Sequence, residues 1–352
     1  MLHERNIIGW DLGGAHLKVA WLDGAGSLQR VEQKATPLWQ GLDPLKAALD
    51  ELAESMPLQD ADHYLTMTGE LVDLFPDRKQ GVVELANFMA AQLPPGRLRV
   101  FAGSIGFVRA VDAVRVHNNI ASANWYATAA WVARQERHAL LLDIGSTTAD
   151  ILLMKRNWLE HRGYNDRQRM TTDELVYSGV VRTPVMAVVQ RVPFKGEWQG
   201  LAAEQFATMA DVYRILGWLP EDADLHPSAD GQAKDLHSSM RRLARMLGTD
   251  LDDGDEQAWR ALARYIADAH LEGYAQAVHR QVSRGIPDDA PLIGAGVGRF
   301  LAERLAERFG RSYLDIDSLI GWDGQEGLSP SVCAPAVAVA QLGIREVLAC
   351  AS

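Results

Sequence analysis

Runs of apolar residues, or of alternating apolar and polar residues, open the chain and predict strands. They span residues 7–12, 17–23 and 28–35. The glycines between the second and third runs are typical of a tight turn, so a three-stranded meander is expected. The next segment instead places apolar positions three or four apart, which predicts a helix at residues 42–56 with Asp43 as N-cap and Pro44 at the first helical position.

Helical and strand patterns alternate along the rest of the chain. Up to residue 136 they predict strands at 63–68 and 98–102 and helices at 81–93 and 121–134. From residue 139 two strand-like runs around a glycine turn appear again, a third run at 157–161 extends them, and helices dominate from about residue 172. The last elements expected are helices at 258–283, 299–309 and 332–349 and strands at 291–294 and 312–316.

The recurrence of the opening pattern predicts an α/β protein with two related domains. We expect the first domain at residues 1–136 and the second at residues 137–330. Residues 218–255 are rich in Asp, Gly and Ser around a short basic helix, and we interpret them as an inserted helical lid. The C-terminal helix, 331–352, is expected to pack back on the first domain.

The composition narrows the class of protein. A net charge of −11 argues against a nucleic-acid surface, which needs a basic patch. Two cysteines provide no disulfide framework, and with no apolar leader at the start they predict a cytoplasmic protein. Gln341, Arg345 and Glu346 interrupt the longest apolar stretch, so no membrane span is expected. The expected partner is a small phosphorylated substrate, and homo-oligomer formation stays open.

The strongest chemical signal is a pair of Asp-x-Gly turns, which begin at Asp11 and Asp143. Glycine lets backbone N–H groups approach phosphate oxygens closely, and a carboxylate suits a Mg²⁺ ion that bridges to those oxygens. We therefore predict that both aspartates bind Mg²⁺ and that the turns hold a diphosphate- or nucleotide-type ligand in a cleft between the domains. The predicted phosphate-binding residues are Gly13, Gly14, Gly145, Ser146, Thr147 and Thr148.

Four further features surround these turns. Lys18, on the return strand of the first turn, can neutralise phosphate charge, although a solvated lysine fits the position equally well. Asp150 lies in an apolar run, where a charge is costly unless it is paired or used, and we favour a functional role. Arg182 is either a clamp for substrate carboxylates or a partner in a structural ion pair. A nucleotide-like pocket is predicted at the glycines of a strand–loop–helix segment: Gly294, Gly296 and Gly298.

In chain order, these motifs resemble the two phosphate motifs and the adenosine motif of the actin/hexokinase/heat-shock-protein ATPase superfamily. The segment DIGSTTADI further resembles the hydantoinase/oxoprolinase branch, and MTGEL, LVYSGVVRTPV and SADGQAKD resemble the tetrahydromethanopterin-linked one-carbon-transfer group. The resemblance implies two ribonuclease-H-like domains with mixed sheets flanked by helices. Two positions depart from the pattern: Ala15 stands where many sugar kinases have threonine, and Ser146 where the hydantoinase-like pattern has glycine.

The resemblance also implies a reaction of methanofuran or methylofuran biosynthesis. A Mg²⁺-dependent alkyl or aryl transferase would condense an aminomethylfuran diphosphate with a (glutamyl)tyramine-type phenol and release diphosphate. The implied catalytic residues are Asp11, Lys18, Asp143, Asp150 and Glu70. Asp173 is a further candidate base. Trp10, Trp125 and Tyr177 are candidates for an aromatic wall around a furfuryl cation, although aromatic residues at such positions more often belong to the core. An ATP-dependent small-molecule kinase or an oxoprolinase/hydantoinase-like hydrolase is the alternative, and a noncatalytic regulator ranks third.

Overall fold

The computed structural model describes residues 5–225, 227–322 and 327–350. The chain divides into two compact units. Unit 1 comprises Met1–Arg137, Met154–Leu159 and Ile316–Ser352, and unit 2 comprises His138–Leu153 and Glu160–Asp315. Each unit is described by itself.

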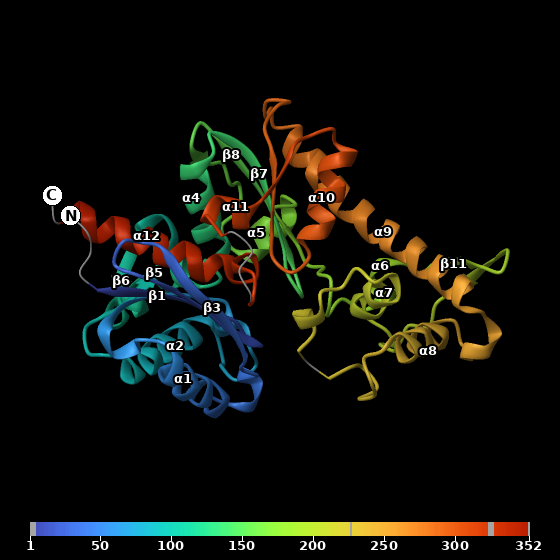
Figure 1. Ribbon diagram of the computed structural model, residues 1–352, viewed down its shortest axis with the longest axis horizontal. Coiled ribbons are helices and arrows are strands. Elements are labelled where there is room, and N and C mark those ends of the chain that lie inside the picture. Colours follow the sequence, from blue (N-terminus) through green and yellow to red (C-terminus); the bar gives the residue numbers. More distant parts are fainter. Residues whose placement is uncertain (1–4, 226, 323–326, 351–352) are drawn as a thin grey trace. The chain divides into compact units, whose positions relative to one another are not determined.

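Unit 1 is built on a six-stranded mixed sheet with the strand order β3-β2-β1-β4-β5-β6 (Figure 1). The strands are β1 (Asn6–Leu12), β2 (His16–Leu22), β3 (Leu28–Ala35), β4 (Ala61–Met67), β5 (Leu98–Phe101) and β6 (Phe107–Arg109). β1 pairs antiparallel with β2 and parallel with β4. β1 lies in the middle of the sheet with helices on both faces, and all of its residues after Asn6 are buried, with Asp11 the one charged residue among them.

Helices cover both faces of this sheet. They are α1 (Asp43–Ser55), α2 (Arg78–Gln92), α3 (His117–Ile120), α4 (Asn124–Gln135), α11 (Ile316–Ile320) and α12 (Ala334–Cys350). α1 and α2 lie on one face, and α12 and α4 lie on the other (Figure 1). α12 approaches β1 closely because Gly9 has no side chain: a Cβ there would come 2.0 Å from the carbonyl oxygen of Ala336.

The second sheet has the strand order β10-β8-β7-β13-β14, with β9 paired to β8. Its strands are β7 (His138–Ile144), β8 (Ala149–Lys155), β9 (Trp158–Leu159), β10 (Leu175–Val176), β13 (Leu292–Ala295) and β14 (Tyr313–Asp315). β7 pairs parallel with β13, as β1 does with β4. The two sheets therefore share one arrangement, in which a central strand lies between its hairpin partner and a parallel strand from much later in the chain.

The rest of unit 2 is mainly helical. Its helices are α5 (Asp166–Thr171), α6 (Val185–Val188), α7 (Met209–Leu216), α8 (Leu236–Met246), α9 (Glu256–Val282) and α10 (Arg299–Arg308), and a separate hairpin joins β11 (Arg191–Phe194) to β12 (Glu197–Gly200). α7 packs against both α8 and α9, and buried residues such as Tyr213, Trp259 and Tyr274 form the core among them.

The predicted fold class is confirmed: the chain is α/β, with two mixed sheets flanked by helices. One local prediction was wrong. Asp43 is the first residue of α1, Leu42 precedes the helix, and no side chain caps its N-terminus. The hairpin β11–β12 and strand β6 were not predicted. None of the described helices is long and apolar enough to cross a membrane.

Candidate phosphate-binding site

Asp11 and Asp143 occupy equivalent positions in the two sheets. Each is the residue before the last of a seven-residue strand, β1 or β7. After Asp11, Gly13 N–H donates to the carbonyl oxygen of His16 at 2.9 Å. After Asp143, Gly145 N–H donates to that of Thr148 at 2.8 Å. Both turns are therefore closed by the same hydrogen bond at the same offset from the aspartate.

A second hydrogen bond also repeats. Thr68 N–H, in the loop after β4, donates to Leu12 O at 2.9 Å, and Gly298 N–H, in the loop after β13, donates to Ile144 O at 2.8 Å. In each case the acceptor is the residue after the aspartate. The structure thus brings the segment with Glu70 to the first turn and the glycine loop to the second turn.

Lys18 lies beside Asp11 in the first turn. The two residues are direct cross-strand partners in the β1–β2 pair, and such partners point to the same face of a sheet. Asp11 is buried and Lys18 is half-buried. A half-buried ammonium group next to a buried carboxylate fits the predicted phosphate-neutralising role better than a fully solvated lysine does.

Glu70 is a buried carboxylate in the short 3-10 helix Gly69–Leu71, and its side chain is 1% exposed. Ser122 Oγ donates to its Oε1 at 2.7 Å. Gly81 of α2 packs on its backbone, because a Cβ on Gly81 would come 2.7 Å from Glu70 O. The carboxylate is therefore held in a fixed place, and its action as a base stays a prediction.

The glycine loop packs directly on the second turn. A Cβ on Gly296 would come 2.6 Å from Asp143 Oδ1, and one on Gly298 would come 2.5 Å from the Ile144 side chain. Gly294 faces Tyr313, whose hydroxyl oxygen would be 2.5 Å from a Cβ. All three predicted glycines are thus needed for close packing, and two of them contact the turn itself.

A further loop, residues 177–183, lies against the second turn. Val180 N–H donates to Gly145 O at 3.1 Å and Arg182 N–H donates to Ser146 O at 2.9 Å. Gly179 packs on the peptide between Ser146 and Thr147, since a Cβ on it would come 2.5 Å from both Ser146 C and Thr147 N. The Arg182 side chain is exposed.

Asp150 is paired with Arg169, whose side chain is 2% exposed. Burial raises the pKa of Asp150, and the positive charge of Arg169 acts in the opposite direction. Arg169 also donates to Glu174 O at 3.2 Å. The charge in the apolar run thus has a structural partner, and a catalytic role for Asp150 stays a prediction.

The three candidates for the aromatic wall differ in how exposed their rings are. Trp10 is 0% exposed and Trp125 is 1% exposed, so both indole rings are packed inside unit 1. Tyr177 is 61% exposed and directly precedes the loop on the second turn. Of the three aromatic candidates, only Tyr177 is accessible.

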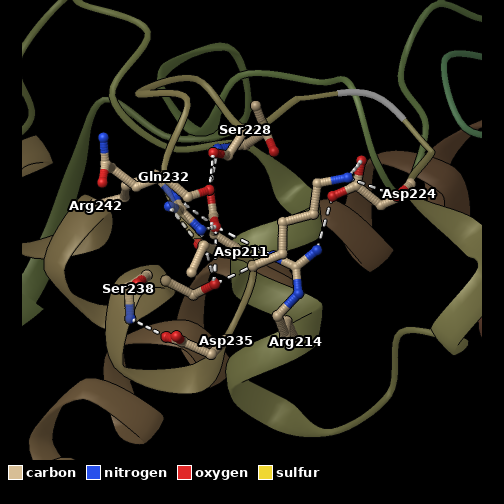
Figure 2. Close-up of polar contacts among 12 residues, drawn as sticks. Asp211, Arg214, Asp224, Ser228, Gln232, Asp235, Ser238 and Arg242 are labelled. Carbon is tan, nitrogen blue, oxygen red and sulfur yellow. Dashed lines mark hydrogen bonds and ion pairs between the residues drawn. The ribbon is translucent and has the colours of Figure 1, made fainter.

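An ion-pair network joins the predicted lid segment to α7 (Figure 2). The Arg242 side chain is 0% exposed, and its guanidinium lies 2.7 Å from Asp211 and 3.0 Å from Asp230. Arg214 bridges Asp211 and Asp224 at 3.3 and 2.7 Å. The basic helix α8 is therefore anchored by acidic residues of its own surroundings, and a lid function over an anionic ligand stays a prediction.

Among the described residues no group of three or more His, Cys, Asp or Glu side chains is placed to hold a metal ion. Mg²⁺ is usually bound by one or two carboxylates together with substrate phosphates and water. The carboxylates of Asp11 and Asp143, each beside glycine amides, fit that donor set, and Mg²⁺ binding by them stays a prediction.

Sequence patterns did not indicate one further contact near the second turn. Ser178 Oγ lies 2.8 Å from His270 Nε2, although the two residues are 92 positions apart. No periodicity or spacing connects residues so distant in the chain. The only available signal was that Ser178 lies within the LVYSGVVRTPV segment.

Two mixed sheets that share the arrangement around their central strands, each with an aspartate-led glycine turn, define a protein of the actin/hexokinase fold type. The chain belongs to the hydantoinase/oxoprolinase family, which it matches over residues 63–345. This confirms the family resemblance that the motifs indicated.

Two archaeal relatives have the same name, (4-{4-[2-(γ-L-glutamylamino)ethyl]phenoxymethyl}furan-2-yl)methanamine synthase. The protein from Methanocaldococcus jannaschii is 28% identical over 341 residues, which are 96% of this chain and 97% of that protein. The protein from Methanococcus vannielii is 28% identical over 117 residues, 33% of this chain and 52% of that protein. In fold, the chain is similar to nucleotide-free acetone carboxylase, with a TM-score of 0.56, 12% identity, and coverage of 87% of this chain and 68% of the carboxylase.

Proposed function

We propose that this protein is a diphosphate-releasing transferase that forms an ether between a phenol and an aminomethylfuran, in methanofuran or methylofuran biosynthesis. The observation that carries this proposal is the similarity to the M. jannaschii synthase, because it extends over nearly the full length of both chains. The two equivalent aspartate turns support it, since a diphosphate leaving group needs donors of the kind that such turns provide.

The proposed reaction exchanges one C–O bond for another. The phenol oxygen attacks the furfuryl CH₂ carbon, the bond from that carbon to diphosphate breaks, and the phenol proton passes to a base. The negative charge that develops on diphosphate must be neutralised as it leaves. At the second turn, the backbone amides and the hydroxyls of Ser146, Thr147 and Thr148 can donate to its oxygens.

Mg²⁺, when bound, would neutralise further diphosphate charge, and Asp11 and Asp143 are the residues proposed to hold it. Lys18 adds a cation on the strand opposite Asp11. Glu70 is the proposed base because it is buried and fixed by Ser122, and a phenol with a pKa of about 10 benefits from a base in water-poor surroundings. Tyr177 is the proposed aromatic contact for the developing furfuryl cation, since its ring is exposed.

The direct test combines purified protein, Mg²⁺, an aminomethylfuran diphosphate and γ-glutamyltyramine or tyramine. We expect ether product and diphosphate in equal amounts, with no requirement for ATP, as measured by mass spectrometry and a diphosphate assay. Asp143→Asn should reduce both products together. ADP release from ATP with no ether formed would contradict the proposal and favour the ATP-dependent kinase or hydrolase.

A further inference from the structure

Three polar side chains of unit 2 form a continuous chain of hydrogen bonds. Ser178 Oγ lies 2.8 Å from His270 Nε2, and His270 Nδ1 lies 2.7 Å from the hydroxyl of Tyr213. Ser178 comes from the loop after β10, His270 from α9 and Tyr213 from α7. His270 and Tyr213 are buried, whereas Ser178 is only half-buried. The chain therefore runs from the core of the unit to a half-buried hydroxyl.

The buried residues His270 and Tyr213 determine which group donates in each of these hydrogen bonds. Burial lowers the pKa of His270 to about 3, so its ring is neutral near pH 7 and has one donor and one acceptor nitrogen. Within the described part of the chain the Tyr213 hydroxyl bonds only to His270. If it accepted from Nδ1, its own proton would be buried without an acceptor, which is unfavourable. Tyr213 therefore donates to His270, and Nε2–H of His270 donates to Ser178 Oγ.

This direction leaves the Ser178 proton available to a third group. The nearest recorded acceptor is Thr183 Oγ1 at 3.4 Å, which is long for a hydroxyl–hydroxyl bond and therefore weak. The next residue, Gly179, packs on the peptide between Ser146 and Thr147. Since consecutive Cα atoms are about 3.8 Å apart, Ser178 lies at the edge of the second turn. An oxygen of a ligand bound at this turn can replace the weak contact with Thr183.

We propose that Ser178 donates a hydrogen bond to the oxyanion held at the second turn, and that His270 and Tyr213 are positioning residues that fix the direction of this donation. The inference rests on the proposed function, in which the oxyanion is the diphosphate of the furfuryl substrate. Successive hydrogen bonds polarise one another, so the Tyr213–His270 bond strengthens the donation from Ser178. Because His270 donates to Ser178 and does not accept its proton, Ser178 is not an activated nucleophile.

The experiment is titration calorimetry of the full chain with inorganic diphosphate in excess Mg²⁺. We expect Ser178→Ala to weaken binding roughly tenfold, because it removes a hydrogen bond to a charged acceptor. Tyr213→Phe keeps the ring and removes only the hydroxyl, and should weaken binding about threefold. Tyr274→Phe is the matched control: its hydroxyl donates to Ser178 O at 2.9 Å in the same loop, outside the donor chain, so affinity should stay within about twofold.

The outcomes separate this inference from the proposed function. If the unmodified protein binds diphosphate and Ser178→Ala binds it equally well, the donor role is wrong and the transferase proposal stands. If the unmodified protein does not bind diphosphate, both are wrong. If Tyr213→Phe and Tyr274→Phe weaken diphosphate binding equally, the hydrogen bonds of Tyr213 and His270 only support the packing of the loop, and their positioning role is wrong. A covalent fluorophosphonate adduct that disappears in Ser178→Ala would identify a nucleophile and overturn the donor role. Thermal unfolding of each variant confirms that the compared proteins are folded.

Discussion

Gly296 packs against Asp143 so closely that a Cβ on the glycine would lie 2.6 Å from the carboxylate oxygen Oδ1 and 2.4 Å from the carbonyl oxygen of Ile144. The contact joins two motifs whose separation in the sequence is more than half the length of unit 2. Gly296 also has φ +79°, a conformation that residues other than glycine rarely adopt. The aspartate of the second turn therefore depends on the glycine loop for its position.

We expect Gly296→Ala to displace the Asp143 carboxylate and to reduce turnover about a hundredfold, since misplacement of a functional group by about 1 Å has effects of this size. The matched control is Gly310→Ala. Gly310 has a similar φ of +62° but open space where its Cβ would be, so it shares the backbone strain and lacks the clash. The comparison requires measurement of turnover and of thermal unfolding for both variants. Equal activities in the two variants would show that Asp143 does not need this contact.

The docking of α12 on the sheet of unit 1 gives a second prediction. Gly9→Ala should lower the free energy of unfolding by about 3 kcal/mol, because its Cβ would meet backbone atoms of Ala336 that cannot rotate away. Gly273→Ala in α9 has open space at its Cβ, and it should raise stability by up to ~1 kcal/mol because alanine favours helix. Urea denaturation of the two variants measures both effects. A Gly9→Ala protein as stable as the parent would contradict the close packing of α12 on β1.

A third prediction concerns acid stability. His63 is buried, accepts from Trp10 Nε1 at 3.1 Å through Nδ1, and donates to Leu58 O at 2.9 Å through Nε2. Burial lowers its pKa to about 4. As the pH falls below the ordinary pKa of histidine, His63 becomes protonated in the unfolded state, whereas in the folded state it becomes protonated only near pH 4. Stability should therefore fall by about 1.4 kcal/mol per pH unit in this window on account of His63.

His63→Gln should remove this contribution, and urea denaturation at several pH values between 4.5 and 7.5 measures the slope. His237→Gln is the control, because His237 is exposed and its replacement should leave the slope unchanged. Burial also lowers the pKa of His270, to about 3, so part of the acid sensitivity should persist after His63 is replaced. An identical slope in His63→Gln and the parent would contradict the prediction.

The sequence could predict the two turns because their chemistry is local: an apolar strand, an aspartate and a glycine suffice to specify each hairpin. The α/β fold class followed from the recurrence of that pattern, whereas the order of the strands in each sheet was not predicted. What the sequence could not show were the contacts over long separations. Examples are the packing of Gly296 on Asp143, the bond of Ser178 to His270, and the pairing of Asp150 with Arg169. The sequence favoured core positions for Trp10, Trp125 and Tyr177 alike, and only the structure separates the two buried tryptophans from the exposed Tyr177.

The ion-pair network of the lid segment gives a fourth prediction (Figure 2). Arg242→Met should destabilise the protein by about 3 kcal/mol, because the buried carboxylate of Asp211 loses its closest cation. The loop around Asp230 should also lose its anchor, which faster hydrogen exchange in residues 227–235 would reveal. Arg241→Met is the control: Arg241 also pairs with Asp230, at 3.3 Å, but its side chain is 36% exposed, so the cost should stay below about 1 kcal/mol. Equal exchange rates in the two variants would mean that Arg242 does not hold the loop.

The last prediction separates a structural role of Asp150 from a catalytic one. Arg169 is almost fully buried and ion-pairs with Asp150, so Arg169→Met should cost about 3–5 kcal/mol, because a buried carboxylate loses its partner. Replacing both residues, as in Asp150→Asn with Arg169→Met, should cost less than the sum of the single changes, since neither charge is then left alone. If pairing is the whole role of Asp150, the double variant, assayed well below its melting temperature, retains turnover within about tenfold of the parent, as expected for a change that only alters packing near the site. If the double variant is folded but forms no measurable ether, Asp150 has a catalytic role in addition to its ion pair.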